Sequence, residues 1–114
     1  VPGAPMQFNF VLGVLGCTPA TVENLAWLVR NIPEGSTWTA TGIGRHQFPL
    51  AAHAIAMGGN VRVGFEDNLY LDKGVLAKSN GELVMRVVEM AKQLGREVAT
   101  SAEARQILSL PARR

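Results

Sequence analysis

Along this chain, apolar strand-like runs alternate with helix-like segments, and few folds accommodate that order. The runs begin near residues 7, 36 and 60, and each is followed by apolar residues at helical spacing. A terminal helix follows the capping box Thr100-Ser101-Ala102-Glu103. Strands and helices in this order form parallel sheets with right-handed crossovers. The sequence therefore predicts an α/β fold of three strand-helix units and a terminal helix.

Capping residues and helix breakers predict where these segments begin and end. The first strand is predicted over residues 7–15, and Thr18-Pro19 is predicted to start the helix that follows it. Pro33-Glu34-Gly35 is expected to end that helix, and Gly58-Gly59 to end the next one. Ser79-Asn80-Gly81-Glu82 is a second capping box and predicts the start of the third helix.

Composition predicts a modest globular domain. The 114 residues are 47% hydrophobic and 18% charged, and no apolar run approaches the ~20 residues of a membrane span. The scattered cations, with a net charge of +2, are a weak indication of nucleic-acid binding. The single Cys17 excludes an internal disulfide and favours the cytoplasm. Residues 1–6 are expected to form a connecting segment, and Trp27 and Trp38 are expected to pack in the interior.

The third strand-like run ends abruptly in charge, as Asn60-Val61-Arg62-Val63-Gly64-Phe65-Glu66-Asp67-Asn68. If it is one extended strand, Arg62 and Glu66 share a face and lie roughly 13 Å apart in different layers. One interpretation is an internal salt bridge of Arg62 beside a turn capped by Glu66 and Asp67. The other is a functional site, because the exits of all three strands carry chemically active residues and parallel sheets place their chemistry at that edge.

The connection after this run is also unusual. It extends over residues 67–78, whereas most loops between strands and helices have about 2 to 6 residues. Long loops after strands commonly form lids or contact substrate, although some are ordinary surface loops. The sequence leaves both possibilities open.

Five stretches resemble the β-keto acid cleavage enzymes, also called the 3-keto-5-aminohexanoate cleavage enzyme family. Together they span nearly the whole chain, and the longest is the most specific. They are Val61-Arg62-Val63-Gly64-Phe65-Glu66-Asp67-Asn68-Leu69-Tyr70, Gly74-Val75-Leu76-Ala77-Lys78-Ser79-Asn80, Phe10-Val11-Leu12-Gly13-Val14, Gly42-Ile43-Gly44-Arg45 and Arg96-Glu97-Val98-Ala99-Thr100.

The resemblance implies a zinc-containing (β/α)₈ TIM barrel, of which residues 1–114 would be a single partial domain. They would form the last three strand-helix units and a C-terminal helix, and the isolated chain is expected to be inactive. The implied reaction converts a β-keto acid and acetyl-CoA to acetoacetate and an acyl-CoA by Claisen addition and retro-Claisen cleavage. Glu66 would be a zinc ligand, while Arg62 and Asp67 would serve catalysis. A homo-oligomer, or pairing with the missing barrel portion, is expected.

The chain departs from the family pattern in its set of zinc ligands. The resemblance implies two further ligands from a His-x-His motif on an early strand, and no such motif occurs here. His53 is expected to be an ordinary helix residue. Cys17 could bind metal but is expected to be a small buried residue. The remaining zinc ligands are therefore expected outside this chain.

Other residues at the strand exits are weaker candidates for substrate contact. His46 lies just beyond the second strand and is expected at the edge of the sheet where the three strands end. Gly13 and Gly44 either let a CoA thioester approach closely or simply allow tight turns.

An alternative interpretation needs no zinc chemistry. A free-standing α/β domain with three parallel strands would expose two sheet edges and the apolar interior of an incomplete barrel. Such a domain would act by self-association or by binding a partner. A His-x-His motif upstream in the reading frame would discriminate against this alternative.

Overall fold

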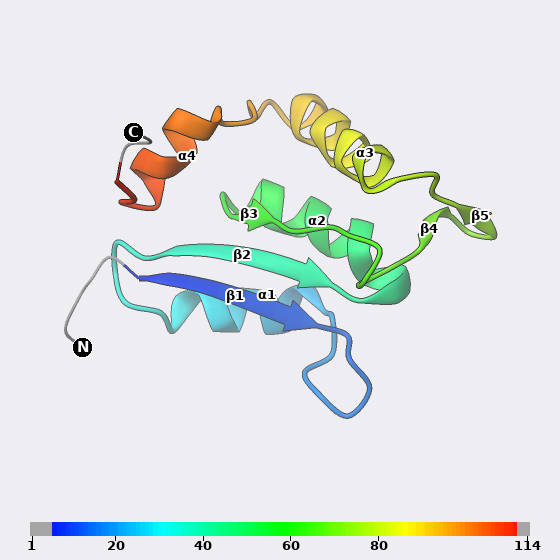
Figure 1. Cartoon of the computed structure of the whole chain (residues 1–114). Coiled ribbons are helices and arrows are strands. Elements are labelled where there is room, and N and C mark those ends of the chain that lie inside the picture. Colours follow the sequence, from blue (N-terminus) through cyan, green and yellow to red (C-terminus); the bar gives the residue numbers. More distant parts are fainter. Residues whose placement is uncertain (1–5, 112–114) are drawn as a thin grey trace.

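A computed structural model describes residues 6–111 and shows an α/β fold (Figure 1). The parallel sheet has three strands in the order β1-β2-β3 and is not closed into a barrel within the described residues. Three strand-helix units and a terminal helix are confirmed, whereas residues 1–5 of the expected connecting segment lie outside the described part. The elements of these units are β1 (Gln7–Leu12), α1 (Val22–Arg30), β2 (Thr37–Gly42), α2 (Gln47–Ala56), β3 (Asn60–Val61), α3 (Asn80–Gln93) and α4 (Ser101–Ile107).

The core lies between one face of the sheet and helices α1 and α2. Side chains alternate along a strand, so every second residue of β1 and β2 points to this face. The buried residues that pack together here are Leu12, Leu25, Trp38, Ala40, Leu50 and Ala54. Trp38 is thus packed as predicted, but Trp27 is 58% exposed on α1, so the prediction for Trp27 is wrong.

The opposite face of the sheet is polar. Gln7 pairs in register with Thr37, and Asn9 with Thr39. Side-chain hydrogen bonds cross between the two strands: Gln7 Nε2 donates to Thr39 Oγ1 at 2.8 Å, and Thr41 Oγ1 donates to Asn9 Oδ1 at 2.9 Å. The expectation of an exposed apolar interior is therefore wrong, because this face carries amides and hydroxyls that bond to one another.

The third strand is much shorter than predicted. β3 ends at Val61, and the chain then turns so that the Gly64 carbonyl accepts from Asp67 N at 3.0 Å and from Asn68 N at 3.1 Å. These bonds replace the ladder that a longer strand would need. Arg62 and Glu66 therefore lie on either side of a turn, and the predicted separation into different layers is wrong.

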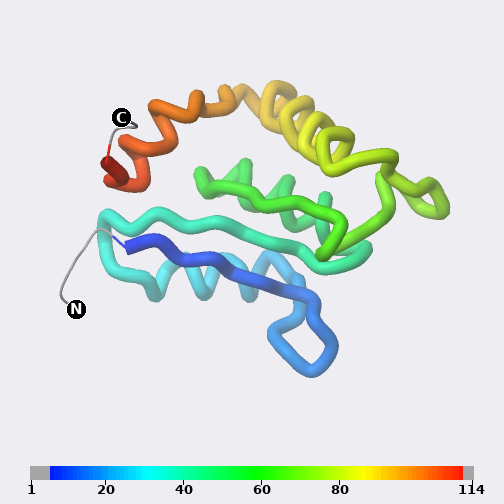
Figure 2. Tube along the Cα trace, in the orientation of Figure 1, coloured from blue at the N-terminus to red at the C-terminus, as the bar shows by residue number. Residues whose placement is uncertain are grey.

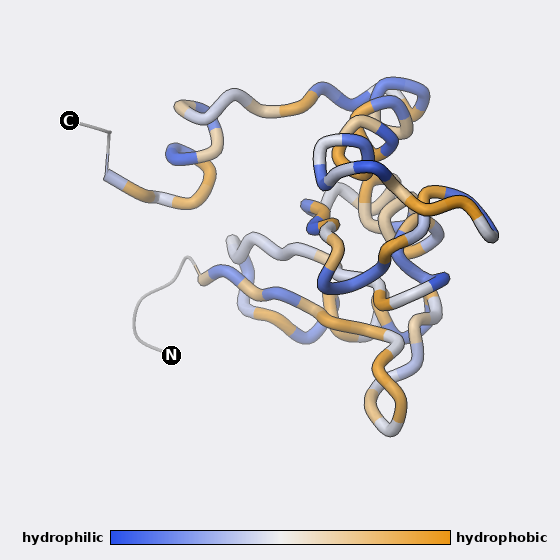
Figure 3. The backbone as a smooth tube through the Cα atoms, turned by 45° about the vertical axis from the view of Figure 1, so that its right-hand side comes forward, coloured by the Kyte–Doolittle hydropathy of each residue, from blue (hydrophilic) through white to orange (hydrophobic). Residues whose placement is uncertain are grey.

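The long connection after this turn contains a small hairpin. Strands β4 (Tyr70–Asp72) and β5 (Val75–Leu76) pair antiparallel, and Gly74 provides a positive φ of 75° at the tip. Figure 2 shows the hairpin projecting beyond the ends of β1 and β2. In Figure 3 its tube is largely orange, which marks hydrophobic residues. The large hydrophobic side chains here are exposed, namely Leu69, Tyr70, Val75 and Leu76.

The observed N-cap residues can be compared with those predicted from the sequence. Thr21, and not Thr18, caps α1 by accepting from Asn24 N at 3.2 Å, so the predicted start is three residues too early. Ser79 caps α3 as predicted, accepting from Glu82 N at 3.2 Å. However, Glu82 Oε2 accepts from Lys78 N at 2.6 Å and not from Ser79 N, so the second half of this predicted box is wrong. Both halves of the predicted capping box of α4 at Thr100 are present. None of the helices in residues 6–111 has the length and hydropathy that crossing a membrane requires.

Candidate active site

The ends of the three strands meet at one edge of the sheet. Gly44, which follows β2, donates its N–H to the Asp67 carbonyl at 2.7 Å and so ties the exit of β2 to the turn after β3. At the exit of β1, a Cβ added to Gly13 would lie 3.1 Å from His46 Cδ2, so the His46 ring lies close to Gly13. The edge where the strands end therefore carries Gly13, Gly44, His46 and Asp67, as the sequence analysis predicted.

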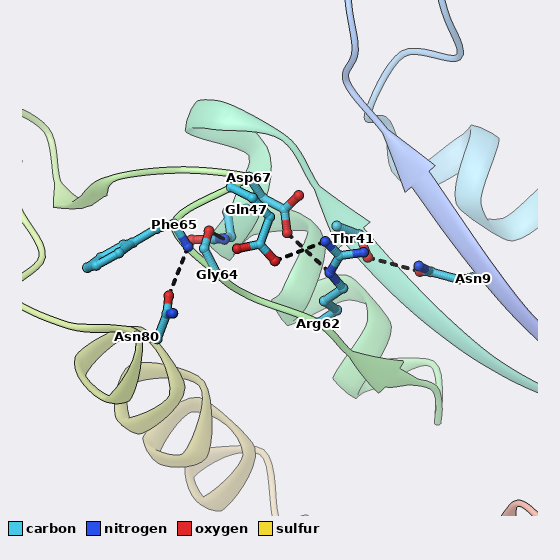
Figure 4. A network of polar contacts seen from close by, with 9 residues as sticks. Asn9, Thr41, Gln47, Arg62, Gly64, Phe65, Asp67 and Asn80 are labelled. Carbon is cyan, nitrogen blue, oxygen red and sulfur yellow. Dashed lines mark hydrogen bonds and ion pairs between the residues drawn. The ribbon is translucent and has the colours of Figure 1, made fainter.

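Arg62 joins the two carboxylates of the turn (Figure 4). Its Nη2 lies 2.9 Å from Glu66 Oε1, and its Nε lies 3.5 Å from Asp67 Oδ2. The chain reversal at Gly64 makes this possible, because it folds residues 66 and 67 back over Arg62. The salt bridge of the first interpretation is present, and it lies at the edge where the second interpretation expects a site.

Glu66 is the exposed acid of the pair. Its side chain is 58% exposed. Hydrogen bonding from its own backbone N–H, followed by the bond from Arg62, lowers the pKa of Glu66. Its carboxylate lies against the backbone of Gly64, where an added Cβ would come within 2.5 Å of Glu66 Oε2. Glycine at position 64 therefore permits this placement of an ionised, accessible carboxylate.

Asp67 is the buried acid, with a side chain only 7% exposed. Burial raises the pKa of Asp67, and the positive charge of Arg62 opposes this rise without cancelling it. Among the described residues, the buried Oδ2 has no hydrogen-bond partner. Two adjacent carboxylates on one guanidinium thus have pKa values displaced in opposite directions, so the exposed acid ionises more readily than the buried one.

Two side chains that the sequence analysis did not single out hold the turn in place. Gln47, buried at the start of α2, donates Nε2 to the Gly64 carbonyl at 3.3 Å. Asn80, the first residue of α3, accepts the Phe65 N–H through Oδ1 at 2.9 Å. Figure 4 shows both reaching the turn from different helices. The sequence carries only a weak signal for them, since polar residues in first helical turns are common.

The described residues do not form a complete metal site by themselves. Within residues 6–111, no three His, Cys, Asp or Glu side chains come together in a way that holds a metal ion. His53 lies on α2, as predicted, where it is exposed, and Cys17 is exposed rather than buried, contrary to the prediction. Glu66 fits the role of a single ligand, because its carboxylate is accessible and its pKa is lowered.

Comparison with known proteins points to one family. The chain is 67% identical to the 3-keto-5-aminohexanoate cleavage enzyme of Fusobacterium nucleatum and 58% identical to that of Acetoanaerobium sticklandii, each over 106 residues. It is 42% identical over 109 residues to the 3-oxoadipate:acetyl-CoA acetyltransferase of Cupriavidus necator. Each match covers 93% of this chain but only 38%, 39% and 38% of the respective relative, so the chain spans under two fifths of their length.

A family model extends this similarity along almost the whole chain. The model of the beta-keto acid cleavage enzymes matches residues 1–110. The match includes the turn at Gly64 with its two carboxylates, the strand exits that meet it and the helices that support it. The chain belongs to the beta-keto acid cleavage enzyme family.

Proposed function

We propose that this chain is the carboxyl-terminal part of an enzyme that converts a β-keto acid and acetyl-CoA to acetoacetate and a new acyl-CoA. The observation that carries the proposal is the contact of Arg62 with an exposed and a buried carboxylate at the carboxyl edge of a parallel sheet. The names of relatives support it, since one is called a cleavage enzyme for a 3-keto acid and another an acetyl-CoA acetyltransferase.

Asp67 is the proposed general base. A carboxylate whose pKa is raised by burial binds a proton more strongly than an exposed one. Its Oδ2 would take a proton from the carbon between the two carbonyl groups of the β-keto acid. The electron pair left on that carbon would attack the thioester carbonyl of acetyl-CoA, and CoA would leave as its thiolate. The thiolate would then add to the original keto carbonyl, and cleavage of the adjacent carbon–carbon bond would release the acyl-CoA. The carbanion of acetoacetate left by this cleavage would take back the proton held by Asp67. Arg62 would orient Asp67 and prevent its pKa from rising further, because the guanidinium opposes the effect of burial.

Glu66 is the proposed zinc ligand of this chain. Zinc accepts carboxylate oxygens and, with an open coordination position, polarises a carbonyl oxygen. The accessible carboxylate of Glu66 would hold the ion from one side, and the other ligands would come from outside this chain. Gly64 supports the role because its lack of a Cβ leaves room for the carboxylate.

We further propose that the sheet continues into a (β/α)₈ barrel formed with the rest of a longer polypeptide. Arg62 N donates to Ala40 O on β2, so the preceding amide, that of Val61, points to the free edge of β3. Beside this edge is a groove of about 540 Å³, whose lining includes Val61 of β3 and Val84, Val87 and Val88 of α3. An additional strand on this edge would cover the valines, and the polar opposite face would line the barrel interior.

The proposal is tested on the complete polypeptide that contains this sequence, purified with its metal. Incubation with acetyl-CoA and a panel of β-keto acids should yield acetoacetate together with the matching acyl-CoA, identified by mass spectrometry. Glu66→Gln should lower the bound zinc per chain, whereas Glu103→Gln on α4 should not. Absence of acyl exchange with every acid in the panel would overturn the proposed reaction. Full zinc content in Glu66→Gln would overturn the ligand assignment.

A further inference from the structure

A second cleft lies next to the candidate active site. It has a volume of about 910 Å³ and lies between the hairpin β4–β5 and the start of α2. Arg45 and Phe48 line it on the α2 side, and Tyr70 and Lys73 on the hairpin side. Its size is in the range of sites for cofactor-sized ligands, which are commonly about 300–1,000 Å³. A small β-keto acid alone would leave most of this space unfilled.

The charged residues of the cleft favour an anion. Its charged lining consists of Arg45, Lys73, Arg86 and Asp72, which gives three cations and one acid. Asp72 is already paired with Arg86 through two contacts of 3.1 Å. Within residues 6–111, Arg45 and Lys73 make no ion pair. Two exposed cations thus remain available, and the two walls of the cleft each contribute one.

The cleft also offers flat apolar surfaces. Tyr70 is 47% exposed on β4. The Arg86 guanidinium lies over the Phe48 ring, with its Cζ 5.4 Å from the ring centroid. Aromatic rings stack on nucleobases with little dependence on which base is present. Cations together with a free aromatic ring are therefore suited to a phosphorylated nucleotide.

Two residues connect the cleft to the acids of the turn. Gly44 lines the cleft, and its N–H donates to the carbonyl of Asp67 at 2.7 Å. Asn68 also lines the cleft and directly follows Asp67 in the chain. A long ligand that occupies the cleft can therefore extend one end toward Glu66 and Asp67.

We propose that this cleft binds the phosphorylated nucleotide end of CoA. The inference rests on the proposed function, in which acetyl-CoA is a substrate. Arg45 and Lys73 contact the phosphate groups, the adenine lies against Tyr70, and the pantetheine arm passes Gly44 to bring the thioester to the turn. The long connection at residues 67–78 then has a specific purpose, because its hairpin forms one wall of the site.

The test measures binding and does not require turnover. The probe is adenosine 3′,5′-bisphosphate, titrated calorimetrically into the complete polypeptide, with acetoacetate as the ligand of the neighbouring site. Arg45→Gln and Lys73→Gln are each expected to weaken bisphosphate binding roughly fivefold, since each removes one charge-assisted contact. Arg30→Gln on α1 and Lys92→Gln on α3 remove the same charges elsewhere and should leave the affinity unchanged. Acetoacetate should bind all variants equally.

Three results would overturn the inference. The first is that the unsubstituted protein shows no saturable binding of the bisphosphate. The second is that Arg45→Gln and Lys73→Gln bind the bisphosphate as well as the two control variants do. The third is that these two variants lose as much affinity for acetoacetate as for the bisphosphate. The last result would assign the cations to the β-keto acid. A failure of the proposed reaction would give a different result. Acyl exchange would then be absent, while bisphosphate binding would still depend on Arg45 and Lys73.

Discussion

Arg62 Nε lies 3.5 Å from Asp67 Oδ2, while Nη2 of the same guanidinium lies 2.9 Å from Glu66 Oε1. One cation thus contacts two consecutive acids in different surroundings. The pKa of the exposed Glu66 is lowered and that of the buried Asp67 is raised. Adjacent carboxylates with opposite shifts are suited to separate tasks, and the following predictions test this division.

Replacing Arg62 with Met should raise the pKa of Asp67 further. Burial has already raised it, and the positive charge of Arg62 is the contribution that opposes the rise. The carboxyl ¹³C resonance of Asp67, followed against pH, should titrate at a higher pH in Arg62→Met than in the unsubstituted protein. Arg30→Met on α1 is the control and should leave the titration unchanged. An unchanged or lower titration point in Arg62→Met would show that Arg62 has no such effect.

Asp67→Asn should stabilise the fold at neutral pH. Because the pKa of Asp67 is higher in the folded than in the unfolded protein, ionisation of Asp67 reduces stability as the pH rises above its ordinary value of 3.8. The amide stays neutral, so urea unfolding at pH 7 should give a free energy roughly 1 kcal/mol higher. The gain should vanish in acid, below both pKa values. A variant less stable at pH 7 than the unsubstituted protein is the contrary outcome.

Gly42→Ala should disturb the edge where the strands end through the backbone. An added Cβ would lie 2.3 Å from the His46 carbonyl oxygen, which belongs to main chain and has little freedom to move. We expect a loss of about 2 kcal/mol in the free energy of unfolding. Gly81→Ala in α3 is the matched control, because the nearest atom to its Cβ would be Ser79 Oγ at 3.5 Å. Equal stability of the two variants would contradict the close approach at Gly42.

Asn80→Ala should slow catalysis without touching the acids. Asn80 Oδ1 accepts the Phe65 N–H at 2.9 Å and so fixes the turn next to Glu66. Loss of this bond should lower kcat roughly tenfold through misplacement of the carboxylates. Asn80→Asp keeps an acceptor oxygen and should restore most of the rate. If both variants lose the same activity, the bond to Phe65 does not position the turn.

Much of the fold follows from local sequence signals. The breakers after α1 and α2 and the caps at Ser79 and Thr100 act through neighbouring residues, so they could be recognised without the structure. The three strand exits could likewise be assigned to one edge, because parallel topology alone requires it.

The details of the site depend on contacts between distant segments, which sequence patterns do not reveal. The run after Asn60 has the composition of a longer strand. However, the Gly64 carbonyl takes two backbone donors of the turn and Gln47 of α2, while Asn80 takes the Phe65 N–H. The polar face of β1 and β2 was missed for a similar reason, since its Gln, Asn and Thr residues are satisfied only by their cross-strand partners.

The most direct measurement is the turnover of Asp67→Asn in the complete polypeptide, recorded together with its zinc content. We predict that acyl exchange falls at least roughly 100-fold, as expected for loss of a general base, while the bound zinc per chain stays unchanged. Turnover close to that of the unsubstituted protein would show that Asp67 is not the base. It would leave the contact of Arg62 with two carboxylates as a structural salt bridge.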